Sequence, residues 1–191
     1  MSTDGQAVTR YSNVAIVLHW AIALLLLLNI GLFWVSENMA EEQGRALMDW
    51  HKSTGMLILI LSLFRLAWRW LHPIPPYPAG LPQMQRFLAK AVHVGFYVIM
   101  IGMPLTGWVM MSGAPPYAQI IFYGLFEWPR LPFVDGAQGA AADFWDAVGG
   151  AHEVLAWLAY GLIALHVAGA LYHQYVARDA IMARMIPRLG K

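Results

Sequence analysis

The chain contains no cysteine among its 191 residues. Structural disulfides, iron–sulfur clusters held by thiolates and haem attached through a Cys-x-x-Cys-His motif are therefore excluded. Charge is also scarce, because Asp, Glu, Lys and Arg make up only 12% of the chain and leave a formal net charge of +1. This balance does not indicate a nucleic-acid partner. Any cofactor must be held by histidine, carboxylate, methionine or packing.

Apolar residues take the place of charge. The hydrophobic content of 59% and the mean hydropathy of +0.52 are not those of a soluble domain. Crossing a bilayer takes about 20 mostly apolar residues, and four windows are long enough: 14–35, 53–71, 91–112 and 154–177. A backbone in lipid must satisfy its own hydrogen bonds, so each window is expected to be a helix. We expect residues 1–191 to form one all-α domain, an integral membrane four-helix bundle.

The placement of charge predicts the orientation. If the two termini and the link between the second and third helices share a side, that side carries nine cations, including those of the tail 178–191, and the other side three. The positive-inside rule then puts both termini in the cytoplasm. The outer link 113–148 is rich in aromatic residues and is expected to cover the outer end of the bundle. The basic tail is expected to lie as an amphipathic segment on the inner surface.

Histidines provide the main functional signal. His152 and His166 are 14 residues apart, so they leave one face of the fourth helix about 21 Å apart along it. His51 begins the second helix on the outer side, and His19 lies near the inner start of the first. Depth therefore pairs His51 with His152 and His19 with His166. Two stacked pairs of imidazoles in a four-helix bundle are what two b-type haems require.

Simpler explanations compete with this one. A single histidine near a helix end is usually snorkelling or hydrogen-bonded, but four at matched depths on three helices are hard to explain in that way. A zinc site would need cysteine or carboxylate neighbours, which are missing. Nearby glycines suit the close approach of a flat macrocycle to the backbone: Gly31, Gly55, Gly95, Gly102, Gly107 and Gly161.

Two arginines support an inner haem. Arg65 follows His51 by the same 14 residues, and Arg69 lies one turn further. A buried arginine needs an anion, so we predict that one or both bind haem propionates. The alternative is snorkelling to the inner surface, which suits Arg69 better than Arg65.

Two further histidines keep two interpretations each. His93 begins the third helix at inner depth, where it is either a competing ligand or, as we favour, a hydrogen-bond donor to a propionate or a backbone carbonyl. His173 lies two turns beyond His166. It is either an interfacial histidine or a residue that hydrogen-bonds a quinone carbonyl and relays a proton.

Several motifs together resemble the bacterial cytochrome b561 family. They cover nearly the whole chain in order: His19-Trp20, His51-Lys-Ser-Thr-Gly55, Arg65-Leu-Ala-Trp-Arg69, Pro73-Ile-Pro-Pro76, Met103-Pro-Leu-Thr-Gly-Trp108, His152-Glu-Val-Leu-Ala-Trp157, and His166 with His173. Many relatives carry two adjacent histidines near the end of the fourth helix, where this chain has Tyr172-His173-Gln174.

The resemblance implies a quinone-linked electron carrier of the bacterial inner membrane. It implies two haem b groups held by His19, His51, His152 and His166, and it excludes His93 as a ligand. The best-understood members are superoxide oxidases, in which superoxide gives electrons to the outer haem and ubiquinone accepts them at the inner one.

Our preferred functional hypothesis is accordingly a superoxide:ubiquinone oxidoreductase. Lys52, with Arg45 and Arg130 behind it, is expected to attract superoxide. Nine acidic residues outnumber these three cations in the outer segments, so the long-range field opposes an anion. A second hypothesis is a carrier subunit that takes electrons from a periplasmic dehydrogenase, hydrogenase or cytochrome docked on the outer link. A third is a haem-free membrane scaffold or transporter.

Overall fold

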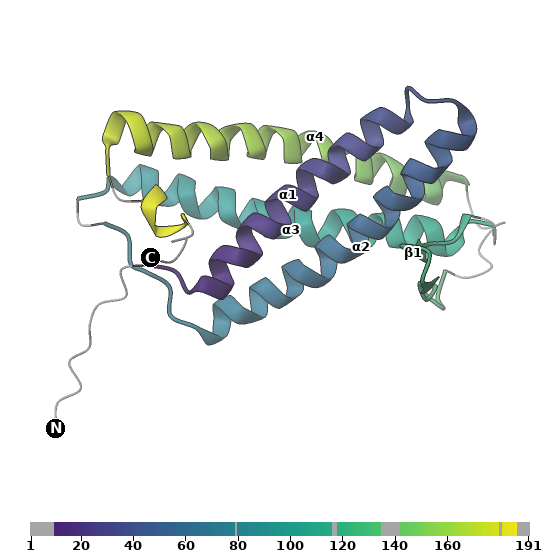
Figure 1. Ribbon diagram of the computed structural model, residues 1–191, viewed down its shortest axis with the longest axis horizontal. Coiled ribbons are helices and arrows are strands. Elements are labelled where there is room, and N and C mark those ends of the chain that lie inside the picture. Colours follow the sequence, from purple (N-terminus) through teal and green to yellow (C-terminus); the bar gives the residue numbers. More distant parts are fainter. Residues whose placement is uncertain (1–9, 79, 116–117, 135–141, 180, 187–191) are drawn as a thin grey trace.

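The computed structural model describes residues 10–78, 80–115, 118–134, 142–179 and 181–186. Four long helices dominate it (Figure 1): α1 Asn13–Ser36, α2 Glu41–Leu71, α3 Gln83–Gly113 and α4 Ala142–Leu171. Each belongs to a stretch long and apolar enough to cross a membrane. The predicted all-α membrane bundle is therefore confirmed.

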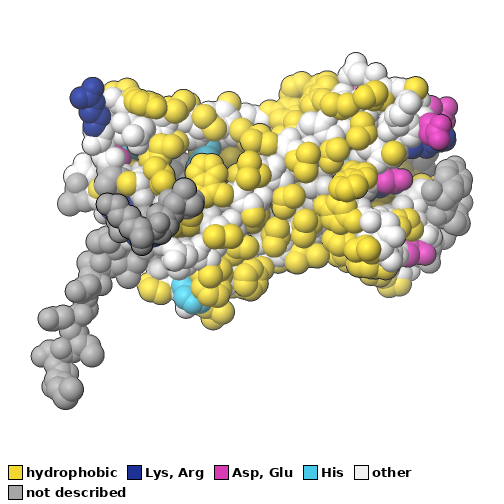
Figure 2. Space-filling view, viewed as in Figure 1, with side chains coloured by type: hydrophobic (Ala, Val, Ile, Leu, Met, Phe, Trp, Pro, Cys, Tyr) yellow, Lys and Arg dark blue, Asp and Glu magenta, His cyan; other side chains and the backbone are white. Residues whose placement is uncertain are grey.

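The helices pack as two antiparallel hairpins. α1 packs on α2 and α3 on α4, and α2 joins the two hairpins by packing on α3. A small buried cluster of Ile22, Ile58 and Met100 marks this junction. Between 6% and 28% of each apolar window is buried inside the molecule. Most apolar side chains therefore face outward, where lipid covers them, and Figure 2 shows this largely hydrophobic surface.

The two ends of the bundle differ in the segments that they contain. The hairpin end holds the turn after α1 and a two-stranded hairpin, β1 Ile121–Phe122 and β2 Phe126–Glu127. The tail end holds the start of α1, the link from Leu71 to Gln83 and the C-terminal segment. Acidic side chains gather at the hairpin end in Figure 2.

α2 is longer than the predicted window 53–71, because it begins at Glu41. Glu41 and Glu42 occupy its first turn, where negative charge is favoured by the helix dipole. An ion pair between Glu41 and Arg45, one turn apart, adds to this. A hydropathy window detects only the apolar part of a helix. It therefore did not predict the first three turns of α2, which are polar.

The described part of the outer link lies against α2 and α3. Ser53 accepts a hydrogen bond from the backbone N–H of Tyr123, and Thr54 bonds the Tyr123 hydroxyl at 3.0 Å. Trp108 of α3 donates to the carbonyl of Pro129. The link thus lies against the side of α2 and near the end of α3. Its predicted role as a cover for the outer end of the bundle stays a prediction. Residues 116–117 and 135–141 of the link lie outside the described residues.

The described part of the C-terminal segment ends at Ile186, and residues 180 and 187–191 of the predicted tail lie outside the described residues. α4 continues as the π-helix η2, Tyr172–Ala177, and is followed by a short 3₁₀-helix η3, Met182–Arg184. The chain then returns across the tail end, where Trp20 donates to the carbonyl of Met185 and Arg10 to that of Ile186. These bonds hold the described part of the tail against the start of α1, and its position on the inner membrane surface stays a prediction.

Candidate functional site

The tail end of the bundle brings histidines of three helices together. The rings of His19 on α1 and His166 on α4 have centroids 6.0 Å apart. A metal bound by two imidazole nitrogens at about 2.0–2.1 Å would separate the ring centroids by slightly more than 6 Å. The spacing therefore suits one metal ion shared by His19 and His166.

His93 of α3 is the third member of this group. Its ring centroid lies 5.7 Å from that of His166, so distance alone does not separate it from His19. His93 also hydrogen-bonds the backbone of Ala89, one turn earlier on its own helix. A hydrogen bond to a backbone carbonyl is one of the two contacts predicted for His93 from the sequence.

At the hairpin end, His51 and His152 are oriented by backbone carbonyls. Nδ1 of His51 lies 3.0 Å from the carbonyl oxygen of Asn29, and Nδ1 of His152 lies 3.1 Å from that of Met103. A carbonyl only accepts, so Nδ1 carries the proton in both rings. Nε2 then keeps the lone pair that a metal ligand needs, an orientation typical of histidine ligands.

Thr106 adds a second contact to His152. Its Oγ1 donates to the carbonyl of Met103 at 2.7 Å and lies 2.9 Å from Nδ1 of His152. The sequence did not predict that Asn29, Met103 or Thr106 would contact Nδ1 of a histidine. The signal available for the last two was their place in Met103-Pro-Leu-Thr-Gly-Trp108, a motif that contains a proline inside a helix.

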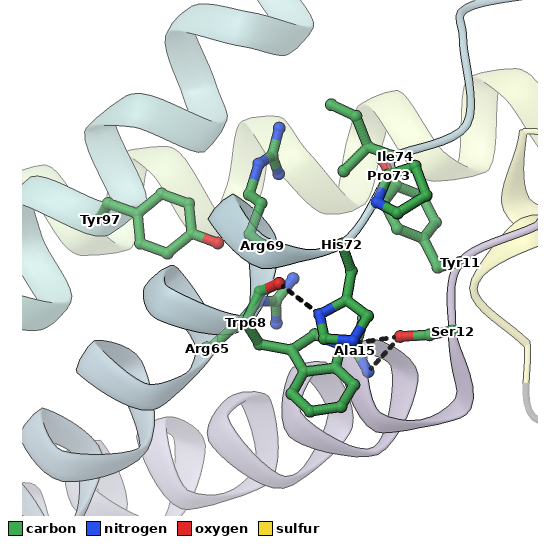
Figure 3. Close-up of a pocket in the computed structure, with 10 residues that line it drawn as sticks. All are labelled: Tyr11, Ser12, Ala15, Arg65, Trp68, Arg69, His72, Pro73, Ile74 and Tyr97. Carbon is green, nitrogen blue, oxygen red and sulfur yellow. Dashed lines mark hydrogen bonds between the residues drawn. The ribbon is translucent and has the colours of Figure 1, made fainter.

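A cavity lies at the tail end of the bundle, between α2 and the start of α1 (Figure 3). It has a volume of about 30 Å³, and its polar lining includes Arg65, Arg69 and Tyr97. Among the described residues, neither arginine pairs with a carboxylate. The Tyr97 hydroxyl is buried without a hydrogen-bond partner. Arg65 is within electrostatic range of His19, His93 and His166. The cavity therefore offers unused donors and positive charge next to the histidine group.

His72 also lines this cavity. Its ring stacks on that of Trp68 with centroids 3.8 Å apart, and its Nδ1 bonds the Trp68 carbonyl. Trp68 in turn donates to Ser12, the residue that caps α1. These contacts hold the end of α2 against the start of α1, and they form one wall of the cavity.

Comparison with known proteins gives the family. The model of prokaryotic cytochrome b561 matches residues 10–188. The chain belongs to the prokaryotic cytochrome b561 family. It is therefore an integral membrane b-type cytochrome.

Three relatives are similar over nearly their full lengths. Cytochrome b561 homolog 2 of Escherichia coli (strain K12) is 28% identical, covering 93% of this chain and 91% of the relative. A probable superoxide oxidase, CybB, of Yersinia pestis is 28% identical, covering 94% and 97%. Cytochrome b562 of Cereibacter sphaeroides is 26% identical, covering 92% and 94%.

The helices that carry the histidine pairs are not packed equally closely. α1 and α4, which carry His19 and His166, do not pack extensively on each other. A Cβ added at Gly31 of α1 or Gly161 of α4 would meet nothing within 4 Å. Gly95 is different, because its Cβ would lie 2.9 Å from Leu162. That glycine allows α3 to pack closely on α4.

The three cations expected to attract superoxide lie near the hairpin end, but each is engaged. Lys52 pairs with Asp49 and its side chain is only 15% exposed. Arg45 pairs with Glu41, and Arg130 donates to the carbonyl of Ser112. Two of the three cations are thus paired with carboxylates, which partly offset the local positive charge expected to attract superoxide.

Proposed function

We propose that this cytochrome holds two haem b groups and passes electrons along α4 from the hairpin end to a quinone at the tail end. The observation that carries the proposal is the histidine geometry. The ring centroids of His19 and His166 lie 6.0 Å apart, a distance suited to a shared metal. At the other end, the Nδ1 atoms of His51 and His152 bond carbonyls, which leaves Nε2 of each ring as the metal-binding atom.

Each pair of histidines would hold the iron of one haem. Haem would supply reversible one-electron storage there, and an iron held by two histidines favours electron transfer over the binding of oxygen. The 14 residues from His152 to His166 correspond to a rise of about 21 Å.

Arg65 and Arg69 are proposed to bind the propionates of the tail-end haem, with the Tyr97 hydroxyl as a further donor. The support is the set of unused donors that line the cavity. Arginine pairs with carboxylates through two parallel hydrogen bonds, and such charged bonds are the stronger ones.

The proposed reaction is the oxidation of superoxide by ubiquinone. Two superoxide ions give one electron each and leave as oxygen, while one quinone takes two electrons and two protons to become a quinol. Superoxide would react at the hairpin end, where Lys52 follows His51 in the chain, and quinone at the tail end. The charge rule puts the tail end in the cytoplasm of the bacterium, so the hairpin end would face the periplasm. A relative named as a probable superoxide oxidase supports this assignment.

Haem content tests the first part. Pyridine haemochrome analysis of the purified protein should give about two haems b per chain, and His152→Ala should remove only the hairpin-end haem. Arg65→Gln should loosen only the tail-end haem. A folded, colourless protein, or a His152→Ala variant that keeps both haems, would exclude the proposed arrangement.

Mixing the purified protein with superoxide and ubiquinone tests the second part. Accelerated superoxide decay with stoichiometric quinol formation is expected. If superoxide decay is unchanged, the proposed donor is wrong.

A carrier subunit is the second candidate, and the hairpin favours it. Leu125 and Phe133 are 77% and 76% exposed near an end where acidic side chains gather. An apolar tip with acidic surroundings suits docking of a basic redox protein. Reduction of the haems by such a protein, without any response to superoxide, would support this alternative.

A further inference from the structure

His173 and Asp179 form a close pair at the tail end, outside the proposed haem sites. His173 Nδ1 lies 2.7 Å from Asp179 Oδ2, and the two side chains are 16% and 25% exposed. The other carboxylate oxygen, Oδ1, accepts the backbone N–H of Ile181 at 3.0 Å. Both oxygens of Asp179 are therefore engaged, and the carboxylate is fixed in orientation.

The backbone departs from regular helix to make this pair. Residues Tyr172–Ala177 form a π-helix, and Arg178 then adopts a left-handed conformation with φ of 51°. The backbone N–H groups of Arg178 and Asp179 both bond the carbonyl of His173. π-Helical turns and left-handed non-glycine residues carry a conformational cost and cluster at functional sites. Here both bring Asp179 back onto His173.

The ring of His173 is partly exposed near the end of the fourth helix. His173 lies seven residues beyond His166, about 10 Å nearer the end of the helix on a similar face. Its side chain is 16% exposed, and Tyr175 and Val176 of the same π-helix are 68% and 67% exposed. A quinone that diffuses within the bilayer would therefore meet this π-helix at the surface of the bundle, where part of His173 is accessible.

We infer that His173 and Asp179 are a proton-transfer pair for quinone reduction, an inference that rests on the proposed function. Asp179 accepts the Nδ1 proton and directs Nε2 away from itself toward the quinone. In each of two proton transfers the Nε2–H bond of protonated His173 breaks and an O–H bond forms on a quinone oxygen. Water restores the Nε2 proton. Two electrons from the tail-end site complete the quinol, so electrons and protons balance.

Asp179 is a positioning residue in this scheme, and its variants separate this role from a structural one. In Asp179→Asn, the amide oxygen still accepts the N–H of Ile181, whereas the amide NH₂ does not accept the Nδ1 proton of His173. Asp179→Glu keeps a carboxylate. Asp146→Asn removes an exposed carboxylate of α4, near the other end of the bundle, and serves as the control.

The experiment uses the full-length protein with its haems, a superoxide source and decyl-ubiquinone. For Asp179→Asn we expect unchanged haem content and unchanged haem reduction by superoxide. Quinol formation should fall at least tenfold with a larger solvent deuterium isotope effect, since general acid–base groups contribute about 10²–10⁴-fold. Asp179→Glu should recover part of the rate, and Asp146→Asn should match the unmodified protein.

The outcomes that contradict the inference are distinct from failure of the proposed function. If the unmodified protein forms no quinol, both are overturned. If Asp179→Asn forms quinol at the normal rate with a normal isotope effect, only the proton-transfer pair is overturned. If Asp179→Asn loses both haem and rate, and Asp179→Glu recovers neither, Asp179 only stabilises the fold of the tail. That outcome also overturns the proton-transfer pair.

Discussion

At the scale of single residues, the two histidines of the hairpin end differ in the hydrogen-bond acceptors that contact their Nδ1 atoms. His51 has one acceptor, the carbonyl of Asn29, while His152 lies between the Met103 carbonyl and the Thr106 hydroxyl. Contacts of this second kind orient a metal ligand and set how strongly the imidazole donates electrons.

Replacing Thr106 with Val should therefore affect one haem only. With one acceptor lost, the Nδ1 proton of His152 is pulled less and the imidazole donates less electron density. The midpoint potential of the hairpin-end haem should rise, that of the tail-end haem should not change, and stability should fall by about 1 kcal/mol. Spectroelectrochemical titration measures both potentials. Thr106→Ser, which keeps the hydroxyl, should behave like the unmodified protein, and equal shifts of both haems would contradict the assignment.

The ion pair between Lys52 and Asp49 predicts that replacing either residue changes the rate with superoxide, but in opposite directions. If Lys52 attracts superoxide, Asp49→Asn frees its charge and should raise the second-order rate with superoxide a few-fold at low salt, whereas Lys52→Gln should lower it. The measurement is the rate of haem reduction at several ionic strengths. Unchanged rates in both variants would remove Lys52 from the proposed site.

Residue identities could be predicted from the sequence where spacing carried the information. The 14-residue interval on α4 and the depths of the other helices brought His19 and His166 to the same place that the structure gives them. Asp179 could not be found in this way, because it reaches His173 only through a π-helix and a left-handed residue. Neither of these features has a periodic sequence signal.

At the scale of elements, the four helices followed from hydropathy, but their ends did not. Polar turns such as Glu41–Asp49 are stabilised by the helix dipole and by ion pairs one turn apart, which a hydropathy window does not detect. The return of the tail over Trp20 depends on backbone acceptors near the end of the chain. The pattern of charged residues in the sequence therefore could not predict this return of the tail.

The contact between the end of α3 and α4 gives a prediction for an element. A Cβ at Gly113 would overlap the indole of Trp145, so Gly113→Ala forces the indole to move. We expect a loss of about 1–3 kcal/mol, typical of overpacking, measured by thermal unfolding in detergent. Gly149→Ala on α4 is the matched control, because its Cβ meets nothing within 4 Å. Alanine there should be neutral or stabilising by up to about 1 kcal/mol.

At the scale of the whole molecule, the two helical hairpins are joined chiefly by α2 and α3. Each proposed haem would add a bridge, because each binds one histidine of the first hairpin and one of α4. A ligand that binds only the folded state stabilises it.

Haem removal should therefore loosen the joint between hairpins and leave each hairpin helical. Protein made in haem-deficient cells should keep its helical circular dichroism, and it should be cut by protease in the Leu71–Gln83 link faster than the haem-loaded protein. Equal cleavage rates would show that packing between α2 and α3 alone holds the hairpins together.

The limited packing of α1 on α4 also has a consequence for biogenesis. If each haem binds one histidine of the first hairpin and one of α4, as proposed, the tail-end haem joins two helices that contact each other at few points, such as the hydrogen bond from Trp34 to Tyr160. Haem would then be able to bind after all four helices have been inserted, by lateral docking within the membrane.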